Sequence, residues 1–424
     1  MKIIGIGAAG NKAVVNAIKL GAAIKDDCLI MNSTIKDFPT DVEIDTALIS
    51  SIGGCGKERE LGKEIMCEYL SNAGAVAKLK EFVGENEDHV VIVTSMAGGT
   101  GSGSANTLGR FIHTELFKAE GIMIDITIIA FRGFNEDLRE LQNSLNFCKD
   151  IDKDFTVQII DNSSFMKLVD GNKIKAEEQA NLSFAVRISF MSGRKIVDSS
   201  QNIDATDLYK LVTTPGYQQI EYAELKDIKN RDDFAKAIKD MIDNSNGLPS
   251  VASCSCFGIM LNINPDTLNY FDFSYEYLKS KYGNTTETYT HIQYCESENV
   301  RDKYEWIAII VSGLDLPVKE MEEMYQRYLE MNSDINENKA KNVDFFSTVV
   351  NLETNAINTS MNRGNRRRRV TSSGTGVPVA SSDFIKRERE EKKTPPLTNG
   401  KLVMNQPTQT GSESDLASRP NNSF

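Results

Sequence analysis

Residues 89–104 read HVVIVTSMAGGTGSGS, an apolar run followed directly by a glycine-rich turn. The apolar run is typical of a buried strand, and residues 104–117 carry apolar side chains at helical spacing. Glycines let the backbone approach an anion, successive N–H groups form an anion-binding nest, and nearby hydroxyls add donors without charge. A flexible linker is not expected between a buried strand and an amphipathic helix. The predicted anion contacts of this turn are Gly98, Gly99, Thr100, Gly101, Ser102 and Gly103.

A second glycine turn lies within residues 2–11, KIIGIGAAGN, between a predicted strand and a predicted helix. This G-x-G-x-x-G pattern presents N–H groups at a helix N-terminus to a phosphate. A dinucleotide site would need an acidic residue at the end of the second strand, which ends in Asn32 instead. A Walker A loop fails as well, because Asn11 and Lys12 stand where it needs Lys and then Ser or Thr. A tight turn without a ligand stays open for this loop alone. The predicted contacts are Gly7, Ala8, Ala9, Gly10, Asn11 and Asn32.

A third glycine cluster follows the strand-like TALISS at residues 46–51 and precedes another helix. Its predicted contacts are Gly53, Gly54, Gly56 and Lys57. The cluster could close over a terminal phosphate, and a plain helix-start loop with a solvated Lys57 explains the spacing equally well. The three loops together predict a nucleoside triphosphate, whose charge normally brings Mg²⁺ held largely by waters and phosphate oxygens.

Short apolar strands alternate with helical patterns over the first third of the chain, which predicts a doubly wound parallel sheet with helices on both faces. The predicted strands are residues 2–7, 28–32, 89–96, 122–131 and 155–161. The predicted helices are residues 11–21, 58–70, 104–117 and 135–150. In such a sheet, ligands bind beyond the carboxyl ends of the strands, so the glycine turns can converge on one phosphate chain.

The pattern changes beyond this sheet. Residues 173–199 predict one long helix that connects two units. A smaller α+β unit is then predicted, with strands at 253–263, 290–296 and 305–314 and helices at 232–243 and 267–282. Residues 318–332 have a clean helical period, and from about residue 351 the composition predicts a disordered C-terminal tail.

The composition is that of a chain able to bury a core, with 25% charged and 40% hydrophobic residues among 424. The net charge of −12 divides into +5 on residues 351–424, which hold 12 basic and 7 acidic residues, and −17 on the remainder. Attraction to an anionic partner is therefore expected only at the basic end. The longest apolar run, residues 121–131, is interrupted by Asp125, and the chain start does not resemble a secretory signal, so we expect no membrane segment.

Seven scattered cysteines without framework spacing predict reduced thiols in a cytoplasmic protein. Cys254 and Cys256 are two apart in an apolar run, which places them on one face of a strand. No His or second Cys pair is spaced to complete a zinc site, so core packing is favoured and no protein metal-ligand set is predicted.

The segment AGGTGSGS at 97–104 is similar to the glycine signature shared by tubulin and the bacterial filament protein FtsZ. The resemblance covers roughly residues 1–340 and implies a tubulin/FtsZ-like fold, with GTPase activity that converts GTP to GDP and phosphate in a head-to-tail homopolymer. Ala8 and Ala9 stand where FtsZ usually has glycines. The implied division is a GTP-binding domain (1–172), a central core helix (173–200), an activation domain with a catalytic loop (201–315), a C-terminal helix (316–350) and a flexible basic tail (351–424).

Residues 202–207, NIDATD, resemble the family's N-x-D-x-x-D loop, which enters the nucleotide pocket of the next subunit. The resemblance therefore implies that Asn202, Asp204 and Asp207 are catalytic, with the carboxylates polarising a water aligned on the terminal phosphate. The two aspartates also form a good helix start, with Asp204 as N-cap and Asp207 favoured by the helix dipole. Both roles can hold together.

The resemblance also implies base and ribose contacts. An Asn amide offers a donor and an acceptor to the guanine edge, and Asn162 in IIDNSSF is similar to the family's guanine-contacting Asn. Asn181 is a candidate second contact, with Gln179 as a rival because the helix register is ambiguous by a turn. Glu136 and Arg139 fall where FtsZ has ribose contacts.

Within the family, residues 202–226 look more like TubZ, the plasmid- and phage-borne branch, than like FtsZ. That branch implies filaments that segregate DNA by capturing, through the tail, a DNA-binding adaptor on a centromere-like site. The four arginines 366–369 and the charged run 386–393 suit an anionic surface. Solvated tail charge, direct DNA binding and filament bundling stay open for this segment, and an FtsZ-like cell-division GTPase is the alternative function.

Overall fold

The computed structural model describes residues 1–50, 53–134, 136–196, 202–243, 253–271, 284–295 and 304–349, together with Lys386. Within these residues the strands form one ten-stranded sheet in the order β3-β2-β1-β4-β5-β6-β7-β10-β8-β9. The strands are β1 (Lys2–Ile6), β2 (Cys28–Asn32), β3 (Asp45–Leu48), β4 (His89–Ser95), β5 (Asp125–Arg132), β6 (Thr156–Asp161), β7 (Gly216–Glu224), β8 (Ser253–Ile263), β9 (Asn284–Tyr294) and β10 (Trp306–Leu314).

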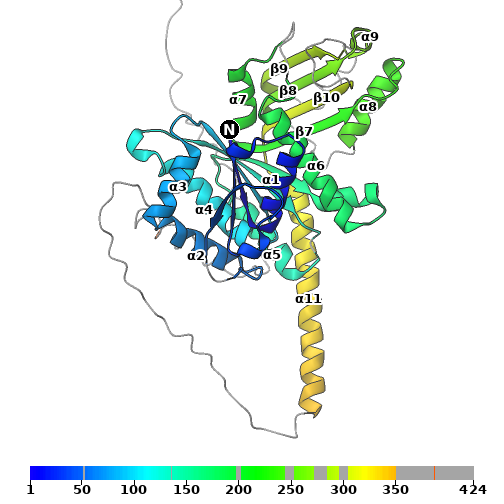
Figure 1. Ribbon diagram of the computed structural model, residues 1–424. Helices are drawn as coiled ribbons and strands as arrows, with labels where there is room; N and C mark the ends of the chain where they lie inside the picture. The colour runs from blue at the N-terminus through cyan, green and yellow to red at the C-terminus, as the bar shows by residue number, and fades with distance from the viewer. Residues whose placement is uncertain are drawn as a thin grey trace, which may run out of the picture.

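The strands from β3 to β7 are parallel, and helices cover both faces of this part of the sheet (Figure 1). The helices that bound it are α1 (Gly7–Lys19), α2 (Arg59–Leu70), α3 (Ala73–Val83), α4 (Thr100–Thr114), α5 (Leu138–Asp150) and α6 (Lys173–Met191). Side chains of α1 and α6 share one buried cluster with Val91 and Val93 of β4, whereas those of α2, α4 and α5 share another with Val90 and Ile92. The predicted doubly wound sheet is confirmed.

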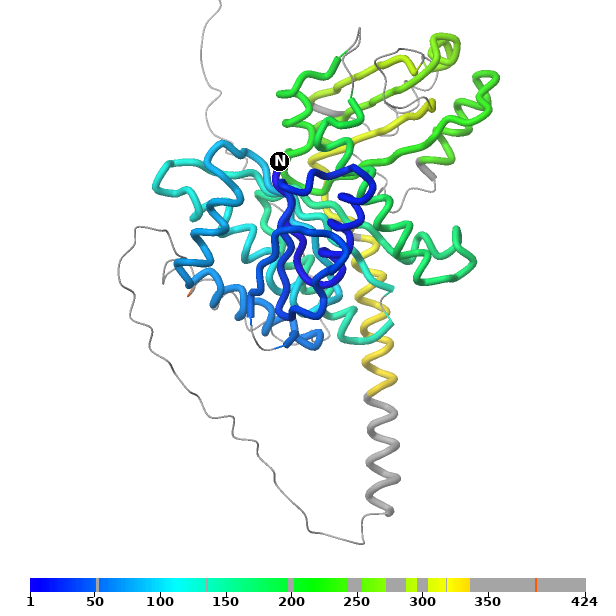
Figure 2. Tube along the Cα trace, in the orientation of Figure 1, coloured from blue at the N-terminus to red at the C-terminus, as the bar shows by residue number. Residues whose placement is uncertain are grey.

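The remaining strands extend the same sheet. β7 and β10 are antiparallel, β10 and β8 are antiparallel, and β8 and β9 are parallel. The join is narrow, because β6 and β7 pair only through Thr156 with Gly216 and Val157 with Tyr217. The elements beside these strands are α7 (Ala205–Thr213), α8 (Arg231–Asp243) and α9 (Pro265–Leu268), whereas α11 (Val318–Val349) packs against α5. The tube in Figure 2 shows this part lying to one side of the parallel part.

Several element bounds differ from the sequence prediction. The helix predicted for 173–199 ends at Met191, because Gly193 takes a positive φ of 70° and its N–H bonds back to Phe190 O. The helix predicted for 318–332 continues to Val349. The glycine turns belong to the helices themselves, since α1 begins at Gly7 and α4 at Thr100. Strand β7 and helix α3 were not predicted.

Some predictions fall outside the described residues: residues 197–199 of the predicted central helix, most of the helix predicted at 267–282, and the basic tail apart from Lys386. Cys254 and Cys256 lie in β8 and are buried, as predicted, but they belong to two different buried clusters, so the prediction that they share one face of the strand is wrong. No helix in the described part of the chain has the length and apolar character needed to cross a membrane.

Candidate functional site

The first two glycine turns meet at the carboxyl ends of β1 and β4, which are adjacent parallel strands. A Cβ atom added at Gly7 would lie 3.1 Å from the backbone N of Gly101, so the two turns touch. A Cβ atom added at Gly101 would lie 2.7 Å from Ile6 O and would also overlap the Thr94 hydroxyl. Only glycine allows this close approach, and it brings the N-termini of α1 and α4 side by side.

Both helix N-termini suit an anion. Within the described residues, neither α1 nor α4 has a side-chain N-cap hydrogen bond or an acidic residue in its first turn. Their first N–H groups and the positive ends of two helix dipoles therefore point to the same edge of the sheet without a carboxylate to compensate them. This arrangement favours a negatively charged group, such as a phosphate.

Polar side chains tie these turns to the end of β2. Asn11 donates a hydrogen bond to Met31 O at 3.2 Å, and its buried Oδ1 has no partner among the described residues. The Thr100 and Ser33 hydroxyls are 2.8 Å apart. Ser102, by contrast, donates its hydroxyl to Gly98 O, and Asn32 shapes its own loop by accepting from Ser33 N at 2.8 Å. Ser33 was not predicted, although it directly follows Asn32.

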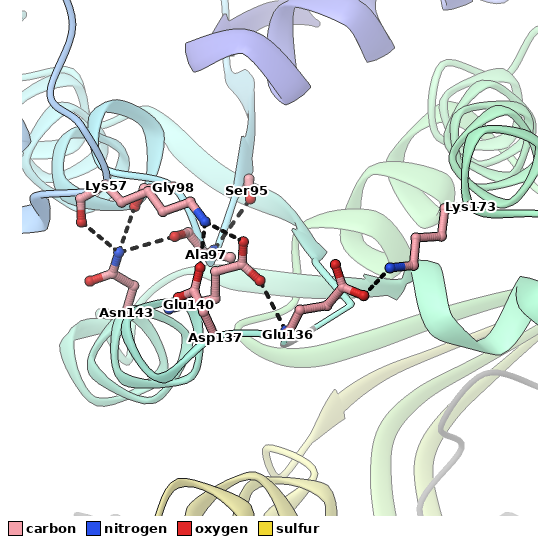
Figure 3. A network of polar contacts seen from close by, with 9 residues as sticks. All are labelled: Lys57, Ser95, Ala97, Gly98, Glu136, Asp137, Glu140, Asn143 and Lys173. Carbon is pink, nitrogen blue, oxygen red and sulfur yellow. Dashed lines mark hydrogen bonds and ion pairs between the residues drawn. The ribbon is translucent and has the colours of Figure 1, made fainter. Parts of the chain in front are cut away.

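The third glycine loop has an unusual backbone, with positive φ at Gly53, Gly54, Gly56 and Lys57. The Lys57 ammonium is bound by two carboxylates of the α5 N-terminus, Asp137 at 2.6 Å and Glu140 at 2.7 Å (Figure 3). These hydrogen bonds raise the pKa of Lys57. Lys57 is thus not simply solvated in this structure. Because the ammonium is about half exposed, such pairs contribute at most about 1 kcal/mol.

Asn143 of α5 links the second and third loops, and sequence reasoning missed it. Its Nδ2 lies 2.9 Å from Lys57 O, 3.0 Å from Ala97 O and 3.2 Å from Gly98 O (Figure 3). Asn143 is 5% exposed, so losing these bonds would leave buried carbonyls unpaired at a cost of roughly 1–3 kcal/mol. The available signal was an Asn inside the apolar face of a predicted helix.

The predicted base contacts lie near the same edge. Asn162 directly follows β6, and its buried Oδ1 has no hydrogen-bond partner in the described part of the chain. In α6, Asn181 is 6% exposed whereas Gln179 is exposed, which favours Asn181 as the inward-facing residue. At the end of β5, Arg132 pairs with Asp161 at 3.4 Å, a contact that the sequence analysis did not predict.

The predicted ribose contacts are engaged elsewhere in this structure. Glu136 forms an ion pair with Lys173 of α6, and Arg139 pairs with Glu58 at 3.4 Å. All four side chains are about half exposed or more, so these are surface ion pairs of small energetic weight.

The acidic loop lies at the opposite edge of the sheet. Asp204 Oδ1 accepts a hydrogen bond from Asp207 N at 2.8 Å, so Asp204 is the N-cap of α7 and the capping interpretation is confirmed. Tyr209 donates its hydroxyl to Asp125 Oδ2 at 2.6 Å, and Asp125 is the first residue of β5. Figure 1 accordingly shows α7 beside the marked N-terminus, where β1 begins.

The length of the strands separates the two sites. β4 has seven residues, so at about 3.3 Å per residue it spans roughly 20 Å. Asn202 and Asp204 are exposed. A carboxylate at the amino edge therefore does not reach a phosphate bound at the glycine turns of the same chain.

Comparisons with known proteins agree with this architecture. No family model matches the sequence. Tubulin-like protein CetZ3 of Haloferax volcanii is 30% identical over 174 residues, which is 35% of this chain and 43% of CetZ3. The chain thus spans less than half the length of that curated relative.

Solved structures match over more of the chain. CetZ2 from Haloferax volcanii, a GTPγS-bound protofilament, has a TM-score of 0.62 at 17% identity, covering 78% of this chain and 100% of CetZ2. TubZ of Clostridium botulinum phage c-st has a TM-score of 0.59 at 19% identity, covering 78% and 97%. The tubulin/FtsZ fold implied by the glycine signature is confirmed.

Proposed function

We propose that this protein binds GTP at the glycine turns, polymerises head to tail, and hydrolyses GTP where two subunits meet. The observation that carries the proposal is the placement of the uncapped helix N-termini and the acidic loop at opposite edges of one sheet. Stacking two subunits along the strands places the acidic loop of one against the glycine turns of the next. The likeness to CetZ2, solved as a GTPγS-bound protofilament, supports both the nucleotide and the assembly.

In this proposal the chain itself supplies electrostatics and positioning. The N-termini of α1 and α4 stabilise negative charge on the phosphates, and Asn162 with Asn181 selects guanine. Asp204 and Asp207 of the neighbour polarise the attacking water, with Asn202 beside them. No cluster of His, Cys, Asp or Glu among the described residues could hold a metal ion. Mg²⁺ would rest on phosphate oxygens, waters and hydroxyls such as Thr100, which fits its chemistry.

The biological role we propose is segregation of plasmid or phage DNA in the cytoplasm, with the basic tail capturing a DNA-binding adaptor. The support is the TubZ-like sequence after the acidic loop and the fold shared with a phage TubZ. The site contacts and the five-part division predicted from the sequence stay predictions.

A mixing experiment tests the shared site. A protein carrying Asp204→Asn and Asp207→Asn keeps its glycine turns, while Gly101→Ala keeps its acidic loop. Each variant alone should release little phosphate from GTP, and an equal mixture should recover activity, because half of the mixed interfaces join an intact turn to an intact acidic loop. Wild-type activity should rise faster than linearly with protein concentration. Linear activity without recovery on mixing would contradict the proposal.

A further inference from the structure

The third glycine loop packs against the second one through its last residues, Cys55 to Glu58. Cβ atoms added at Gly53, Gly54 or Gly56 would meet no described atom within 4 Å, so the first part of this loop is not packed. Its end is packed, because a Cβ atom added at Gly99 would lie 2.8 Å from Glu58 N and 2.9 Å from Cys55 Cβ. The buried Cys55 and the backbone at Lys57 and Glu58 therefore position this end of the loop against the second loop.

Side chains of helix α5 bind both the backbone carbonyl and the ammonium group of Lys57. Asn143 binds the Lys57 carbonyl, and the same amide binds Ala97 O and Gly98 O of the second loop. Glu140, one turn before Asn143, and Asp137, two turns before it, bind the Lys57 ammonium (Figure 3). An amide has two N–H groups, so three carbonyls share them, and the Asn143 side chain sets the distance between the two loops.

We propose that Asn143 is a positioning residue that sets the preference of the site for a nucleoside triphosphate over a diphosphate. The inference rests on the proposed function. The helix N-termini of α1 and α4 are fixed by the sheet and bind phosphates in either nucleotide. The third loop is the part that can close over a terminal phosphate, and the Asn143 amide ties its Lys57 carbonyl to the Ala97 and Gly98 carbonyls of the second loop. Loosening the third loop therefore weakens binding of the triphosphate more than binding of the diphosphate.

The test compares the affinities of fluorescent GTPγS and GDP for wild type and Asn143→Ala. We expect the GTPγS affinity to fall about tenfold, the effect of losing roughly one or two buried hydrogen bonds, and the GDP affinity to stay within about twofold. Asn143→Ser, which keeps one donor, should be intermediate. Asn146→Ala is the matched control, because it removes the same side chain from the same helix and its buried Oδ1 has no partner among the described residues.

An equal loss of affinity for both nucleotides would show that Asn143 only supports the fold. Unchanged affinities would show that the Asn143 contacts do not affect nucleotide binding. Either result overturns the inference. Hydrogen exchange without nucleotide gives an independent measurement. Amides of residues 55–58 should exchange faster in Asn143→Ala than in Asn146→Ala, and equal rates would also overturn it. Wild-type protein that binds neither nucleotide would instead refute the proposed function. The exchange rates would still show whether Asn143 holds the third loop in place.

Discussion

The two edges of the parallel sheet are built on opposite principles. At the carboxyl edge, glycines bring backbone groups together, and two helices begin without caps or acidic residues. At the amino edge, α7 begins with a capping carboxylate, carries a second aspartate in its first turn and is anchored through Tyr209. The starts of α1 and α4 at one edge carry no carboxylate and the start of α7 at the other carries two, so the two helix starts and the acidic loop complement one another between two copies of the chain.

The largest expected effect comes from neutralising the amino edge. Asp204→Asn keeps an N-cap acceptor but removes the charge, so stability should stay within about 0.5 kcal/mol. Phosphate release from GTP should fall by roughly 100-fold or more, as expected when a general base is lost. GTP binding and filament formation should persist. Asp204→Ala, which removes the cap as well, should lose about 1 kcal/mol of stability in addition. Normal turnover in Asp204→Asn would refute the catalytic role of the acidic loop.

The carboxyl edge is broken by Gly101→Ala. The new methyl group would overlap Ile6 O and the Thr94 hydroxyl, and forcing the turns apart should cost about 2–3 kcal/mol in unfolding free energy. GTP affinity should fall strongly, whereas α7 at the other edge should keep its structure. Chemical denaturation and nucleotide titration measure both effects. Gly98→Ala is the stability control, since its added methyl group would meet no described atom within 4 Å; equal destabilisation of both variants would contradict the crowding argument.

The sequence predicts the parts of these two edges that depend on local patterns, and it misses the parts that depend on contacts between distant residues. The glycine turns were predictable because their local pattern, a strand followed by glycines and a helix, is also their structure. Asn143, Arg132 and Tyr209 were not, because each acts through a residue distant in sequence: Lys57, Asp161 and Asp125 respectively.

Strand β7 was missed for a related reason. Gln218 and Gln219 are buried, which a binary apolar pattern does not anticipate. Gln218 accepts a hydrogen bond from Gln158 of β6 at 2.6 Å and donates to Leu211 O of α7 at 3.0 Å. The bond to Gln158 extends the contact between β6 and β7 beyond its two backbone pairs, and the bond to Leu211 O joins β7 to α7, so the buried glutamine is explained only by partners distant in sequence or in another element.

Acid provides a second probe of the amino edge. His89 begins β4, is fully buried against Thr127, and lies edge-on to the Tyr209 ring at 6.4 Å. Burial lowers its pKa from 6.5 to about 3. Between pH 6.5 and about pH 3, His89 is protonated in the unfolded chain but neutral in the folded protein. Its contribution to the free energy of unfolding is therefore full above pH 6.5 and is lost as the pH falls below that value. At pH 5 the loss should reach about 2 kcal/mol.

The matching variant is His89→Gln, which can still hydrogen-bond to the Thr127 hydroxyl. Wild type should lose stability relative to this variant between pH 7.5 and pH 5, as measured by denaturant unfolding at each pH. A constant difference between the two proteins would show that His89 titrates normally in the folded state.

The smallest expected effect belongs to the anchor of α7. Tyr209→Phe removes the hydrogen bond to Asp125 but keeps the ring, and because Tyr209 is 36% exposed the loss should be about 1 kcal/mol or less. The variant separates two ways in which the amino edge can work. If α7 must be held in a fixed position for its carboxylates to align with the neighbour's nucleotide, phosphate release per filament subunit should fall several-fold while the unfolding midpoint hardly moves. Thr213→Val, which removes a hydroxyl that donates to Tyr209 O near the end of the same helix, is the control and should leave turnover unchanged. Equal turnover in both variants would mean that the N-cap at Asp204, and not the anchor at Tyr209, determines where the acidic loop points.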